Sequence, residues 1–132
     1  MISGVLAPDI DSVWIQVEPE IARVTDRFDT GERPEHFYQR LIKREQQLWL
    51  CNGGEGLFIT EVKIFPEFKL LAVPIVAGKN MDKWMVGMVD TCKAFAKHHQ
   101  CKYIEGYGRK GWLRALHKHG FKDYAITTRL EV

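Results

Sequence analysis

The longest uninterrupted apolar run of the chain, Leu70–Ala77, is followed by an amphipathic stretch and then by a shorter apolar segment. The amphipathic stretch carries apolar residues at helical spacing on one face, namely Met85, Met88, Val89, Cys92, Phe95 and Ala96. The pattern predicts a central strand over residues 69–76, a helix that Asp82 caps, and a strand over residues 102–107. Because a strand–helix–strand crossover joins parallel strands with a right-handed turn, the sheet should contain at least one parallel pair.

Pro74 lies inside the predicted central strand and has no backbone N–H group to donate. The strand is therefore expected to bulge, or to part from one of its neighbours, at this residue. Backbone groups that are freed at such a gap need other partners, so the gap is a candidate docking edge for a ligand.

The remaining elements are predicted in the same way, helices from the helical spacing of apolar residues and strands from short apolar or alternating runs. Helices are expected over residues 10–24, 34–45 and 110–119. Strands are expected over residues 47–52, 56–65 and 121–130. Pro19 should kink the first helix or divide it, Gly53-Gly54 should form a tight hairpin turn, and Gly120 should close the last helix. The predicted order is α-α-β-β-β-α-β-α-β, a mixed β-sheet flanked by helices, of class α/β or α+β.

Composition and run length exclude several classes of protein. With 45% hydrophobic and 27% charged residues, the chain is expected to form one domain over residues 1–132 and not a disordered or coiled-coil protein. Its longest apolar run is far shorter than the ~20 residues that cross a bilayer. Residues 1–6 lack the basic start of a secretory leader. We therefore expect a soluble cytoplasmic protein with no membrane partner.

The metal-ligating residue types do not form a recognisable site. An odd number of cysteines without C-x-x-C spacing predicts reduced, mostly buried thiols at Cys51, Cys92 and Cys101. The clustered histidines lack the spacing of a zinc site: His98, His99, His117 and His119. No metal is therefore predicted.

Charge divides unevenly along the chain. Residues 1–66 hold 7 Lys and Arg against 11 Asp and Glu, whereas residues 67–132 hold 12 against 6. Lys110, Arg114 and Lys118 are spaced by four, which places them on one face of the predicted last helix. The C-terminal half is expected either to meet an anionic partner or to present a merely solvated basic face. Nucleic acid is one possible partner, since Tyr107 and Trp112 could stack on bases.

The segment Leu71-Ala72-Val73-Pro74, the helix and strand that follow it, and the pair Gly120-Phe121 resemble the two main signatures of the GNAT superfamily of acyl-CoA N-acyltransferases. In that family a strand ends in V-x-P, and a G-F pair precedes the final strand. The resemblance covers roughly residues 46–131. The run Tyr107–Arg114 is similar to that of short GNAT-like proteins encoded by tailed bacteriophages.

The resemblance implies a GNAT-like sheet, acetyl-CoA or another acyl-CoA as cofactor, and phage structural or packaging proteins as partners, in the host cytoplasm or the virion. In the family, backbone N–H groups at a helix N-terminus bind the CoA diphosphate through the pattern R/Q-x-x-G-x-G/A. The residues that would contact the cofactor are Val73, Pro74, Val76, Gly78, Lys79, Asn80, Lys83, Arg109, Lys110 and Arg114. The candidate catalytic residues for acid–base chemistry are Glu105 and Tyr107. Glu61 could also face the cleft but is expected to be a solvated strand residue.

The sequence departs from the family pattern at several of these positions. Ala77 replaces the Arg or Gln, Asn80 the first glycine and Asp82 the second, while Leu116 lies where the catalytic tyrosine usually falls. A carboxylate at residue 82 would repel a diphosphate. The sequence therefore predicts a degenerate acyl-CoA site, without cofactor, in a virion-associated or accessory binding protein. The alternatives are an active N-acetyltransferase, with Glu105 or a water as base and Tyr107 as acid, and more weakly a nucleic-acid-binding protein.

Overall fold

The computed structural model describes all residues from 1 to 132 and places five strands in one mixed sheet. The strands are β1 (Ile2–Val5), β2 (Gln47–Cys51), β3 (Gly56–Ile64), β4 (Lys69–Gly78) and β5 (Tyr103–Gly106). Their order in the sheet follows their order in the chain. The pairs β1–β2, β2–β3 and β3–β4 are antiparallel, whereas β4 and β5 are parallel.

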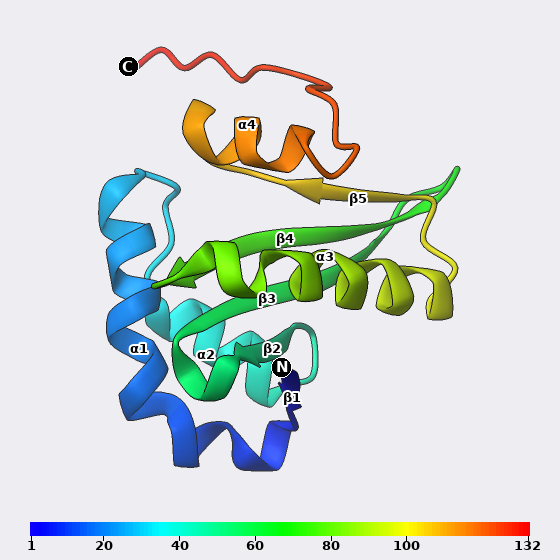
Figure 1. The fold of residues 1–132 in the computed structure, drawn as a ribbon. Helices are drawn as coiled ribbons and strands as arrows, with labels where there is room; N and C mark the ends of the chain where they lie inside the picture. The colour runs from blue at the N-terminus through cyan, green and yellow to red at the C-terminus, as the bar shows by residue number, and fades with distance from the viewer.

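Four α-helices cover the sheet (Figure 1). They are α1 (Ile10–Arg27), α2 (Pro34–Ile42), α3 (Met81–His98) and α4 (Lys110–His117). Two short 3₁₀ turns, η1 (Ala7–Asp9) and η2 (Asn52–Gly54), precede α1 and β3. None of the helices combines the length and the apolar character that crossing a bilayer requires.

The core consists of two apolar clusters, one on each face of the sheet. One cluster joins the sheet to α3 and α4 through residues such as Phe58, Leu71, Met88, Cys92 and Leu116. The other joins it to α1 and α2 through residues such as Ile21, Leu41, Ile59 and Ile75. The clusters divide β3 and β4 by alternation, since Phe58 faces α3 while its neighbour Ile59 faces α1.

The predicted fold class is confirmed, and the elements from α1 to α4 follow the predicted order. Two parts of the sequence differ from the prediction. Residues 2–5 form β1, an edge strand too short to show a recognisable alternation. Residues 121–130 form no strand and lie extended beyond α4 (Figure 1), so the predicted final strand is wrong for this structure.

Two predicted helix details can be compared with the structure. Pro19 does not divide α1, which runs through it as one helix because the apolar face on both sides of the proline packs on the sheet. The residue that caps α3 is Asn80 and not Asp82, which lies in the first turn. Gly120 follows α4 with a φ of +91°, as a helix stop often requires.

Candidate functional site

β4 is irregular where Pro74 interrupts it. Ile59 of β3 pairs with Ile75 and Glu61 pairs with Ala72, so the two residues Val73 and Pro74 together oppose one residue of β3. This is a β-bulge on β4. It leaves Pro74, which has no backbone N–H group, outside the hydrogen-bonded ladder.

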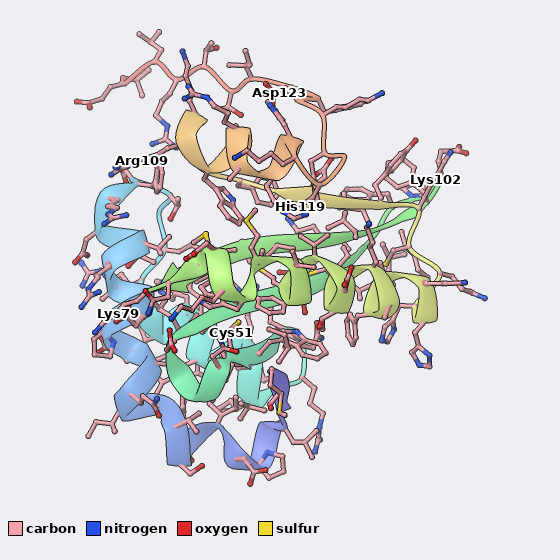
Figure 2. All side chains as sticks on the ribbon, in the orientation of Figure 1. Cys51, Lys79, Lys102, Arg109, His119 and Asp123 are labelled. Carbon is pink, nitrogen blue, oxygen red and sulfur yellow. The ribbon has the colours of Figure 1, made fainter.

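The parallel ladder between β4 and β5 ends at the same place. Its last pair joins Val73 to Gly106, while β4 continues to Gly78 with a partner on the β3 side only. The predicted parting of two parallel strands at Pro74 therefore occurs in the structure. Since parallel strands end at the same edge of a sheet, the loops after β4 and β5 share that edge. Lys79 and Arg109, one from each loop, lie on the same side of the molecule (Figure 2).

The loop between β4 and α3 is held in a fixed conformation by three hydrogen bonds and by the close approach of Gly78 to the backbone at Glu55. Gly78 has a φ of +127°, and a Cβ atom there would lie 2.3 Å from the carbonyl oxygen of Glu55. Lys79 N donates to that same oxygen at 2.8 Å, and the indole Nε1 of Trp84 donates to Lys79 O at 2.7 Å. Asn80 adopts the left-handed conformation, in which its side chain donates to Glu55 Oε2 at 2.7 Å. Asparagine tolerates this conformation better than other non-glycine residues, which explains how it replaces a glycine.

The electrostatics of this helix start do not suit a diphosphate. An α-helix N-terminus attracts anions, but here Glu55 and Asp82 already place two carboxylates beside it. Lys79 and Lys83 are exposed and form no ion pair, so the loop is formally balanced in charge and not positive. The backbone N–H of Lys79 is also occupied by Glu55 O. The residues present therefore do not fit the diphosphate of a CoA cofactor.

Glu105 and Tyr107 lie at the carboxyl end of β5, where the ladder stops. The hydroxyl of Tyr107 donates to Glu105 Oε1 at 3.2 Å. Burial, reinforced by the nearby charges of Glu105 and Glu61, raises the pKa of Tyr107 to about 12. Tyr107 therefore keeps its proton at neutral pH, as a proton donor must.

Glu61 is less solvated than the sequence suggests. It is half-buried, and Gln46 Nε2 donates to Glu61 Oε1 at 2.7 Å. The register places Glu61 and Glu105 on the two strands that flank Ala72, so both carboxylates lie in one row across the sheet. Gln46 itself is 4% exposed, and its Oε1 has no hydrogen-bond partner.

α4 divides its predicted residues between core and surface. Lys110 and Arg114 are exposed and form no ion pair, whereas Trp112 and Leu116 pack against the α3 cluster. Leu116, at the position of the family's tyrosine, is 4% exposed. It lines an apolar cavity of about 10 Å³ beneath α4, which is large enough for no more than one water. A leucine in this place packs the core and supplies no proton.

Arg109, in the loop after β5, contacts the start of the connection between α1 and α2. Its guanidinium carbon lies 5.5 Å from the ring centroid of Phe28, at the end of α1. Phe28 and Glu55 are contacts that the sequence analysis missed. For Glu55 the antiparallel hairpin gave a usable signal, since the residue before β3 lies opposite the residues that follow β4.

The whole chain resembles solved acetyltransferase structures at low sequence identity. No family model and no curated protein sequence matches it. A predicted acetyltransferase from Clostridium acetobutylicum, solved with acetyl-CoA, has a TM-score of 0.69 at 15% identity and covers 99% of this chain and 95% of that chain. The ribosomal-protein-alanine N-acetyltransferase from Brucella melitensis biovar Abortus has a TM-score of 0.69 at 11% identity, covering 100% and 99%.

A third structure has the same extent of similarity. An aminoglycoside acetyltransferase from an uncultured soil metagenomic sample, in complex with sisomicin, has a TM-score of 0.67 at 13% identity and covers 100% of this chain and 95% of that chain. Sequence identities this low carry the fold and not the activity. With its mixed sheet, its bulge at Pro74 and these full-length similarities, the chain has a GNAT-like fold.

Proposed function

We propose that this chain is a GNAT-like domain with a degenerate acyl-CoA site, which acts as a binding or accessory protein and not as an acyltransferase. The observation that carries the proposal is the helix start after β4, where Glu55 and Asp82 lie at the first turn of α3. One unit charge about 4 Å from another interacts with about 4 kcal/mol at the effective dielectric constant near a protein surface. Because Lys79 and Lys83 only balance these two carboxylates, the helix start has no net positive charge with which to hold a diphosphate.

The proposal is tested by titrating acetyl-CoA into the protein in a calorimeter. The wild-type chain should bind with a dissociation constant of about 1 mM or weaker. The double variant Glu55→Gln, Asp82→Asn should bind about tenfold more tightly, because the repulsion is removed while the side-chain shapes remain. Asp90→Asn, on an exposed later turn of α3, is the matched control and should leave the affinity unchanged. Micromolar binding by the wild type, or no gain in the double variant, would contradict the proposal.

A second candidate function is N-acetyl transfer to an amine, which the geometry of Glu105 and Tyr107 favours. Tyr107 holds its proton at neutral pH, and Glu105 accepts a hydrogen bond from it at the strand end. Release of free thiol from acetyl-CoA in the presence of a panel of primary amines measures this activity. If the wild type is active, Tyr107→Phe should lower the rate about a hundredfold. Thiol release that Tyr107→Phe leaves unchanged counts against this function.

Partners and location are proposed on the resemblance alone. A phage structural or packaging protein is the proposed partner, in the virion or in the host cytoplasm, and nucleic acid is the weaker alternative. If nucleic acid binds at the exposed Lys110 and Arg114, affinity should fall steeply with salt and be lost in Arg114→Glu.

A further inference from the structure

The segment after α4, residues 123–131, has the sequence of a strand but no strand to pair with. Its large apolar residues lie at even-numbered positions, with Thr128 between the second and the third, and the side chains are almost wholly exposed: Tyr124 at 92%, Ile126 at 91% and Leu130 at 86%. In an extended backbone, residues two apart point to the same face, so these three side chains form one apolar stripe. An exposed stripe of this kind is costly in water unless another surface covers it.

The backbone of the segment is also without partners. No backbone–backbone hydrogen bond involves any residue beyond Phe121. Two side-chain contacts hold the segment: His117 Nε2 lies 2.7 Å from Asp123 Oδ1, and Arg129 Nη1 donates to Asp29 O at 2.5 Å. Figure 1 shows the segment passing beyond α4, on the side away from β5. In this position it cannot reach the sheet of its own chain.

The sheet offers a complementary free edge at β5. β5 pairs with β4 on one side and with nothing on the other. Tyr103 and Tyr107, on this strand and just beyond it, are about half exposed. Aromatic side chains on an edge strand are good cross-strand neighbours for the isoleucine and leucine of an added strand. Each copy of the chain thus carries both an unpaired strand-like segment and an unpaired strand edge.

We propose that residues 123–131 of one copy pair with the outer edge of β5 in a second copy, and that the exchange is reciprocal in a twofold dimer. A twofold arrangement satisfies both segments and both edges at once, and leaves no open edge to continue into a fibre. The pairing supplies the missing backbone hydrogen bonds and buries the stripe of Tyr124, Ile126 and Leu130. This proposal does not depend on the function proposed for the acyl-CoA site.

The mass of the full chain in solution tests the proposal, measured by light scattering behind a sizing column over a range of loading concentrations. The wild type should have the mass of a dimer. Ile126→Lys should weaken the dimer roughly a hundredfold or more, because a charge in the centre of the stripe would have to be buried in the pairing. Thr127→Lys, one residue along and on the opposite face, is the matched control and should remain dimeric. Circular dichroism checks that both variants are folded.

Hydrogen exchange supplies the second measurement. The amides of residues 123–131 should be protected in the wild-type dimer and unprotected in Ile126→Lys. A monomeric wild type at every concentration overturns the proposal, whether its segment is unprotected or is protected by pairing with its own β5. A dimer that Ile126→Lys leaves intact also overturns it, because the contact must then lie elsewhere.

Discussion

The two halves of β4 differ in how they are held. Leu70–Ala72 pairs with β3 on one side and β5 on the other, so backbone hydrogen bonds from two neighbours fix it. Beyond the bulge at Val73 and Pro74, Ile75–Gly78 pairs with β3 alone and then enters the loop before α3. There the conformation depends on a small number of particular contacts, chiefly those of Gly78, Asn80 and Trp84. The backbone of the paired half is therefore fixed by hydrogen bonds from two neighbouring strands, whereas the backbone of the half that borders the candidate site depends on a few particular contacts.

The largest effect expected from this difference is that of Gly78→Ala. An added Cβ atom would lie 2.3 Å from Glu55 O and 2.4 Å from Gly56 Cα, and the φ of +127° is itself strained for alanine. Backbone atoms cannot move aside as a flexible side chain can, so we expect a loss of about 3 kcal/mol or more in the free energy of unfolding. Chemical denaturation measures it.

The matched control is Gly31→Ala, in the connection between α1 and α2. Gly31 also has a positive φ, +81°, but nothing lies within 4 Å of the position of its Cβ atom. Its substitution should cost only the backbone strain, about 1 kcal/mol. Equal losses in the two variants would show that the close approach of β4 to Glu55 does not restrain the loop.

A smaller difference is expected between two tryptophans. Trp84, 2% exposed, donates its indole N–H to Lys79 O, whereas Trp49 donates to Thr60 Oγ1 at 3.0 Å. Trp84→Phe removes the donor that holds the loop and should cost about 2 kcal/mol. Trp49→Phe should cost about 1 kcal/mol, because the hydroxyl of Thr60 keeps its hydrogen bond to Gln47 Oε1. Thermal or chemical denaturation of both variants measures the difference, and a larger loss in Trp49→Phe would reverse the interpretation.

The same contrast separates what the sequence could predict from what it could not. The apolar run before Pro74, the long helix with its regular apolar face and the short apolar segment at Tyr103 are all local patterns in the chain, and each element was predicted correctly. The bulge and the end of the parallel ladder were also predictable, because proline lacks a donor wherever it lies in a strand. These features depend on local covalent chemistry and on periodicity.

The details around the site depend on contacts between distant residues, and the sequence did not reveal them. The hairpin register brings Glu55 near Asn80 but does not show that their side chains bond, and nothing at Arg109 indicates that Phe28 lies beneath it. The segment 121–130 shows the opposite error, because the sequence predicted a strand that the structure does not contain. Its alternation indicates a strand, but a strand exists only where an edge is within reach, and the alternation says nothing about that.

The smallest expected effect concerns Tyr107, beyond the last pair of the parallel ladder. Burial, with the nearby charges of Glu105 and Glu61, raises the pKa of Tyr107 in the folded state from 10.0 to about 12. Between these two pH values the folded protein holds a proton that the unfolded chain has lost. The contribution of Tyr107 to stability is therefore complete below pH 10 and is lost as the pH rises through 12.

Tyr107→Phe should change the free energy of unfolding little at pH 7, and should make the fall in stability above pH 10 shallower. Burial also raises the pKa of Cys51 and Cys92 to about 12, but both thiols are present in the wild type and the variant, so their effect cancels in the comparison. Urea denaturation at intervals across the alkaline range measures the two slopes. Glu105→Gln removes one of the charges and the hydrogen-bonding carboxylate while leaving the half-exposed tyrosine in place, and should give an intermediate slope. Identical slopes in all three proteins would mean that the end of β5 is as open to water as the edge of the sheet, and that no sheltered proton donor exists there.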